Sequence, residues 1–181
     1  LFATSVRPEE TSDGPQPLLP IDSPGSELQV HKAAFFFRLE RELEKINAFY
    51  LQKESELRTR LTTLITKKRH LIALANRPVG HNVITRDTPS LVTLLEGFRY
   101  FEKDLSKLQQ FIEINATGFR KILKKWDKRF KSQTKELYLA RQVEVQPCFN
   151  REFMTEMSDI ASASILQLES LADGHELPST P

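Results

Sequence analysis

Apolar residues recur every three or four positions from Glu27 to about Asn76, and charged residues fill the positions between them. Such spacing gathers apolar side chains on one face of an α-helix. The first proline or glycine after Glu27 is Pro78, so nothing within the segment interrupts a helix. The pattern predicts one long helix over 27–76, with Ser26 as its N-cap. Its core-facing positions are Phe36, Leu39, Leu43, Ile46, Tyr50, Leu57, Leu61 and Leu64.

A second stretch is more regular and follows a break that contains Pro78, Gly80 and Pro89. Its pattern alternates steps of three and four, as in a heptad repeat. The positions are Leu91, Leu94, Phe98, Phe101, Leu105, Leu108, Ile112, Asn115, Phe119, Ile122 and Trp126. The pattern predicts a helix over 88–131 that packs antiparallel to the first and continues through Gly118. Many of the aromatic side chains are bulky for a slim coiled coil, which favours a bundle of more than two helices.

The rest of the chain is less regular. Residues 1–26 contain half of the ten prolines and are expected to form a disordered linker. We expect a short helix near 135–142, a final helix from about 151 to 171 and a frayed tail. The predicted fold is therefore all-α, with two long antiparallel helices and shorter C-terminal helices. The predicted division is a linker at 1–26, a core domain at 27–145 and a C-terminal segment at 146–181.

Positive charge is concentrated at the end of the second predicted helix. From Phe119 to Lys135 there are eight basic residues and one acid, Asp127, which gives this segment a charge of +7. The whole chain carries only +2, so the remainder carries −5. A helical wheel at about 100° per residue places four lysines within an arc of about 100°, opposite Phe119, Ile122 and Trp126. These are Lys121, Lys124, Lys125 and Lys128.

Two interpretations of this face are open from composition alone. A solvated helix face normally mixes signs, as "RLERELEK" does in the first helix. The four lysines have no acid among them, although like charges at this spacing cost a few tenths of a kcal/mol each. An anion site would explain why the lysines are present despite this repulsion. Lysine ammonium groups suit clustered phosphates. A compact, highly phosphorylated small molecule fits the charge density best.

Other functions find less support in the sequence. There is no motif for reading duplex DNA, and the aromatic residues needed to stack single-stranded nucleic acid are predicted to be buried. No apolar run is long enough to span a membrane. No catalytic constellation or metal-type spacing is present, so we expect no enzyme activity, no metal and no cofactor. The single cysteine, Cys148, is compatible with a reducing cytoplasmic or nuclear compartment.

The stretch "INATGFRKILKKWDK" resembles the signature helix of the SPX domain family, and "FFFRLERELEKINAFYLQKESEL" resembles an earlier helix of the same family. The resemblance covers roughly 32–131. It implies an SPX-type helical bundle that binds inositol polyphosphates or pyrophosphates as reporters of phosphate status. Carried over by residue, the implied ligand contacts are Lys121, Lys124, Lys125 and Lys128, with Arg129 and Lys131 as secondary candidates.

The continuation "ELYLARQVEVQPCFNRE" is similar to the fungal phosphate-response regulators of this family, which join an SPX domain to ankyrin repeats. That likeness implies inhibition of a cyclin–cyclin-dependent-kinase complex through the full-length protein. The family's N-terminal helical hairpin, which contributes to the ligand site, finds no match before Glu27. The alternatives are a helical protein-interaction scaffold, or the SPX module of a polyphosphate- or glycerophosphodiester-metabolising protein.

Overall fold

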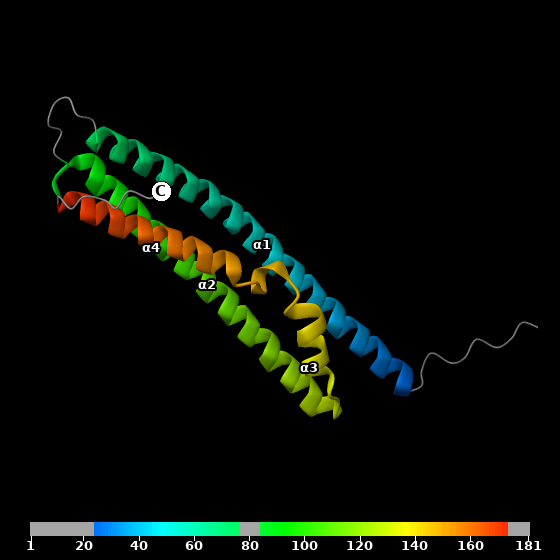
Figure 1. Cartoon of the computed structure of the whole chain (residues 1–181). Helices are drawn as coiled ribbons and strands as arrows, with labels where there is room; N and C mark the ends of the chain where they lie inside the picture. Colours follow the sequence, from blue (N-terminus) through cyan, green and yellow to red (C-terminus); the bar gives the residue numbers. More distant parts are fainter. Residues whose placement is uncertain (1–23, 77–83, 174–181) are drawn as a thin grey trace, which may run out of the picture. The chain divides into compact units, whose positions relative to one another are not determined.

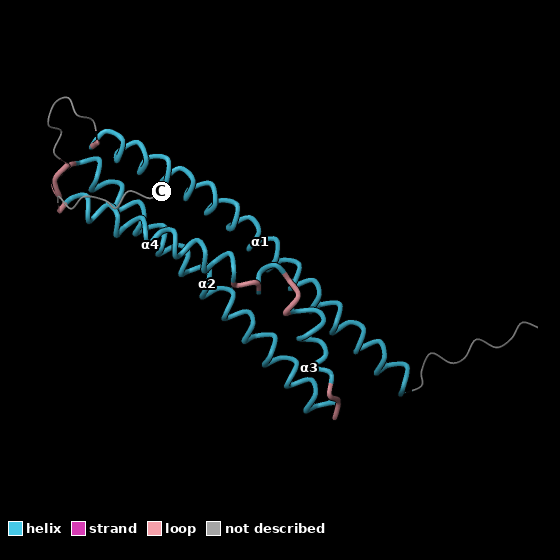
Figure 2. The backbone as a smooth tube through the Cα atoms, viewed as in Figure 1, coloured by secondary structure: helices cyan, strands magenta, loops and turns pink. Residues whose placement is uncertain are grey.

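A computed structural model describes residues 24–76 and 84–173, and all structural statements concern these residues. The predicted linker up to residue 23 and the predicted tail from residue 174 lie outside them. The described elements, shown in Figure 1, are α1 (Pro24–Ala75), α2 (Pro89–Phe130), α3 (Thr134–Tyr138), the π-helix η1 (Leu139–Val143), the 3-10 helix η2 (Pro147–Phe149) and α4 (Glu152–Ala172). Figure 2 shows no strand in the described residues, and the predicted all-α fold is confirmed.

The chain divides into two compact units, with the boundary inside α1 between Glu40 and Arg41. In the first unit the rings of Phe35 and Phe36 pack edge to face with centroids 5.1 Å apart. The second unit holds the rest of α1 and all later elements. The predicted domain limits near residues 26 and 145 stay predictions.

Within the second unit, α1 and α2 run antiparallel. As residue numbers rise along α1, the numbers of their partners fall along α2. Three contacts mark this order: the Phe49 and Phe111 rings with centroids 4.6 Å apart, Arg60 Nη1 with Asp104 Oδ2 at 2.8 Å, and the close approach of Leu64 to Gly97. The antiparallel pairing predicted from the two heptad patterns is therefore observed.

A third helix, α4, completes the core of this unit, as expected for a bundle of more than two helices. Side chains from α1, α2 and α4 form one buried apolar cluster. The α2 members are Leu91, Leu94, Phe98, Phe101, Leu105 and Leu108, all of which are predicted heptad positions. Lys68 of α1 reaches across to α4, where its Nζ donates to Ser164 Oγ and Gln167 Oε1, both at 2.9 Å. Burial lowers the pKa of Lys68.

The heptad prediction is wrong beyond Phe119. Ile122, predicted to face the core, is 43% exposed, whereas its neighbour Leu123 is fully buried. The reason is that α3 packs against the last turns of α2. It is attached there through Asp127, which lies one turn after Leu123, so α3 covers the Leu123 side of the helix. Trp126, also predicted as a core anchor, is only half-buried and stacks on Phe130 with centroids 4.1 Å apart.

Two other details of the predicted helices differ from the structure. Because α1 begins at Pro24, Ser26 lies inside its first turn and is not its N-cap. The short helix predicted near 135–142 is α3 followed directly by the π-helix η1, whose wider turn places Leu139 and Val143 in buried positions. The final helix, α4, lies within a residue or two of its predicted limits.

Candidate anion-binding site

The four lysines singled out in the sequence project from α2 into solvent. Lys121, Lys124, Lys125 and Lys128 are all exposed. Phe119 and Leu123, on the other side of the helix, are buried and hold it in place. Residues three or four apart on a helix lie about 5–6 Å from each other at Cβ, so these side chains share one continuous surface. We call these four residues the lysine face.

Within the described residues, no acidic side chain neutralises the lysine face. Among the described residues, none of its four ammonium groups lies within 4.0 Å of a carboxylate. Many other cations of the second unit are paired, namely Arg41, Lys45, Lys53, Arg58, Arg60, Arg86, Arg99, Lys107 and Lys135. The lysine face is therefore a run of four neighbouring cations that form no ion pair among the described residues.

The helix macrodipole accounts for part of this charge. The C-terminal end of a helix is negative and favours cations in its last turn. Lys128 and Arg129 occupy that turn of α2. The effect falls off within one turn, so it does not explain Lys121, Lys124 and Lys125. These three lysines repel each other without a compensating interaction in the fold, which favours an external anion.

Arg129 and the residues after it adjoin the face. The Arg129 guanidinium lies over the Phe130 ring, 5.6 Å from its centroid. Lys131 ends the helix in the left-handed conformation and is exposed. Lys135 differs from both, because its Nζ is 2.7 Å from Glu136 Oε1.

Asp127 is the residue whose role the sequence did not reveal. Its Oδ1 accepts hydrogen bonds from Ser132 Oγ at 2.6 Å and Thr134 N at 3.0 Å, and its Oδ2 accepts from Lys135 N at 2.9 Å. Desolvation acts to raise the pKa of Asp127, but these hydrogen bonds outweigh it and hold the pKa below its ordinary value. Both oxygens are thus engaged by the α2–α3 turn, and neither pairs with the lysine face.

A shallow hollow of about 520 Å³ adjoins the face at Lys121. Its other lining residues are Gln110, Glu113, Ile114, Thr117 and Gly118. It lies along the part of α2 that precedes the other three lysines.

A separate pocket of about 400 Å³ lies between α1 and α2 but is a poor anion site. Its apolar floor includes Phe49 and Phe111. The cations on its rim are already used, because Lys53 pairs with Glu56 while Arg60 and Lys107 pair with Asp104. An anion would have to displace these carboxylates, whereas the lysine face requires no such exchange.

Other kinds of site find no support in the part of the chain that the structure describes. No group of three or more His, Cys, Asp or Glu side chains there could hold a metal ion. No helix in the described ranges is long and apolar enough to cross a membrane. Burial raises the pKa of the Cys148 thiol to about 11, so this thiol is protonated at neutral pH.

The sequence model of the SPX domain family matches residues 4–88 and 93–141, which is well over half of the chain. The chain therefore belongs to the SPX domain family. The match includes the whole lysine face, and it begins upstream of the two helical motifs on which the resemblance was first based. No solved structure matches the chain.

Similar proteins come from fungi and plants. "Ankyrin repeat protein nuc-2" of Neurospora crassa is 51% identical over 174 residues, which is 96% of this chain and 16% of that protein. "Phosphate system positive regulatory protein PHO81" of Saccharomyces cerevisiae is 41% identical over 144 residues, or 80% of this chain and 12% of that protein. A rice "SPX domain-containing membrane protein" is 34% identical over 110 residues, which is 61% of this chain and 14% of that protein. The chain thus spans a small part of each of these relatives.

Proposed function

We propose that this domain binds inositol polyphosphates or pyrophosphates through Lys121, Lys124, Lys125 and Lys128, and that it senses phosphate status for a larger regulator. The observation that carries the proposal is the lysine face itself. It presents four exposed ammonium groups on one side of α2, none of them paired with an acid in the described residues. Its role is binding, with no chemical step.

The arrangement of the lysines favours a ligand that bears several phosphates on a small frame. The four residues span two turns of helix, about 10 Å along its axis. A single phosphate would contact one or two ammonium groups and leave the others repelling each other. A ring with phosphates on most of its carbons presents charges at comparable spacing, so it can neutralise the whole face. Lysine suits this task because its ammonium group is a mobile point charge with three donors.

The names of the relatives support the regulatory part of the proposal. One is called a phosphate system positive regulatory protein, and another is an ankyrin repeat protein. We infer that this chain is the SPX module of such a phosphate-response regulator, in the cytoplasm, the nucleus or both. Regulation of a cyclin–cyclin-dependent-kinase complex would then require the full-length protein.

A helical protein-interaction scaffold is the competing function. Large apolar side chains are exposed on several described elements, including Ile114, Leu137, Val145 and Leu166. They lie on different elements, with Val145 in the turn between η1 and η2, and they do not explain why the lysines form no ion pair among the described residues. In a scaffold the lysine face would contact only solvent. An experiment must therefore distinguish a solvated lysine face from one that binds an anion.

Chemical-shift mapping tests the location of binding. Inositol hexakisphosphate is titrated into the ¹⁵N-labelled chain and, in parallel, into the chain extended at its N-terminus. The proposal predicts saturable shifts of the backbone amides of residues 119–131. Shifts confined to the pocket around Phe49 and Phe111, or the absence of shifts in both forms, would contradict it.

A further inference from the structure

One residue at the edge of the lysine face has an unfavourable backbone conformation. Lys131 has φ 49° and ψ 39°, and it is the one non-glycine residue with positive φ among those described. Helices commonly end with such a left-handed residue, but glycine usually occupies the position because a Cβ atom is disfavoured there. Lys131 also adds a further positive charge after Lys128 and Arg129. The left-handed backbone opposes folding here, and glycine would avoid that cost.

Hydrogen bonds to Asp127 hold the turn that contains Lys131. The Asp127 backbone oxygen accepts from Lys131 N and, at 3.2 Å, from Ser132 N. Its carboxylate accepts from Ser132 Oγ, Thr134 N and Lys135 N. One residue therefore satisfies five donors across the junction between α2 and α3.

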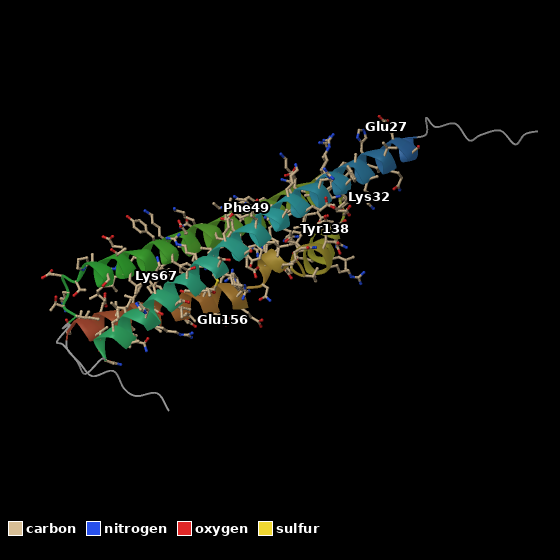
Figure 3. The ribbon with its side chains drawn as sticks, turned by 90° about the horizontal axis from the view of Figure 1, so that it is seen from above. Glu27, Lys32, Phe49, Lys67, Tyr138 and Glu156 are labelled. Atoms are coloured by element: carbon tan, nitrogen blue, oxygen red, sulfur yellow. The ribbon has the colours of Figure 1, made fainter. Side chains whose placement is uncertain are left out.

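The far side of the junction is anchored in the core. Tyr138, labelled in Figure 3, is buried, as are Leu139 and Val143 in the π-helix that follows. Leu123 of α2 is fully buried, and α3 packs against this helix. The chain thus leaves α2 along a defined path after Lys131, and the Lys131 side chain is exposed one turn after Lys128 in the sequence.

We propose that Lys131 is a fifth phosphate-contacting cation of the lysine face, and that Asp127 is the positioning residue that holds it there. This inference rests on the proposed function. An acid in the middle of a basic segment would ordinarily weaken anion binding. Here it serves the site, because its carboxylate is turned to the backbone of the next element.

The first test is Lys131→Gly, with inositol hexakisphosphate as the probe and calorimetry as the readout. Loss of one exposed charge contact should raise Kd roughly fivefold. The same substitution should raise the thermal midpoint by about 2–4 °C, because glycine is favoured in the left-handed conformation. Weaker binding by a more stable protein is the expected pair of results. An unchanged Kd would overturn the role of Lys131.

The second test separates positioning from general stability. Ser132→Ala removes one donor to Asp127 without altering any charge, and Asp127→Ala removes the acceptor. Each variant is measured alone and in the Lys131→Gly background. If Asp127 acts by positioning Lys131, both substitutions weaken binding when Lys131 is present. In the Lys131→Gly background they have little further effect. Equal effects in the two backgrounds would overturn the positioning role, and Ser132→Ala keeps this test available if Asp127→Ala does not fold.

Lys124→Ala distinguishes failure of this inference from failure of the proposed function. If Lys124→Ala weakens binding while Lys131→Gly does not, the lysine face binds the ligand without Lys131 and only the further inference fails. If neither substitution changes the affinity, the lysine face is not the site and both proposals fail.

Discussion

A Cβ atom placed on Gly97 of α2 would lie 2.8 Å from Cδ2 of Leu64 on α1, closer than real Cβ contacts allow. Leu64 is itself buried in the core cluster. The absence of a side chain at Gly97 therefore permits the close approach of the two long helices. Gly118 lies on the same helix, yet an added Cβ there would meet nothing within 4 Å.

These two glycines give a matched pair of stability predictions. Gly118→Ala should stabilise the chain by about 1 kcal/mol, since alanine is the better helix former and has room. Gly97→Ala brings the same gain in helix propensity, but its Cβ atom crowds Leu64. Overpacking in a core typically costs about 1–3 kcal/mol. We expect a net destabilisation of up to about 2 kcal/mol, measured by urea unfolding. Equal effects of the two substitutions would show that the helices do not approach as closely as described.

Substitutions at Ile122 and Leu123 test which side of α2 is buried near its end. Leu123→Ala should destabilise the chain by about 2–5 kcal/mol, because the side chain is fully buried. Ile122→Ala should cost about 1 kcal/mol or less, because Ile122 is 43% exposed. The comparison uses chemical denaturation of both variants under one set of conditions. The reverse order of the two effects would restore the simple heptad register.

The lowered pKa of Asp127 predicts that the stability of the fold depends on pH. Its pKa is below the ordinary value of 3.8 in the folded chain, so the unfolded chain takes up this proton more readily. The stability it provides is therefore present above about pH 4 and is lost as the pH falls through its folded pKa. Asp127→Asn should cost about 1 kcal/mol at pH 7, by analogy with helix caps, and less at pH 3.

The control for this prediction is Asp159→Asn, which changes an exposed aspartate on α4. Denaturant unfolding of both variants is measured at pH 7 and at pH 3. A cost for Asp127→Asn that does not change between the two pH values would mean that the carboxylate charge plays no part in holding the α2–α3 turn.

Helical periodicity was sufficient to predict the two long helices, because their core contacts repeat with the helix itself. The antiparallel order of α1 and α2 and the burial of Leu91 through Leu108 follow from that repetition. The exposure of the four lysines could also be predicted, since a wheel that places Phe119 inside places them outside.

The end of α2 could not be predicted in the same way. The burial of Leu123 depends on α3, which packs there through a turn with no helical period. The hydrogen bonds of Asp127 join residues five to eight positions apart, and a wheel shows Asp127 only as an acid beside the basic arc. A weak signal was available in the spacing of Asp127, Ser132 and Thr134, since short polar side chains are common where one helix ends and another begins.

Calorimetric titration with inositol hexakisphosphate at low salt tests most directly whether the lysine face of this SPX domain binds a polyphosphate. The variant Lys124→Ala/Lys125→Ala is compared with Lys103→Ala, which removes an exposed lysine about 32 Å away along the same helix. Both are studied in the chain and in its N-terminally extended form. We predict that the double variant raises Kd at least about tenfold and that the control matches the unsubstituted protein. Equal affinities for the two variants, or no heat of binding in either form, would contradict the claim.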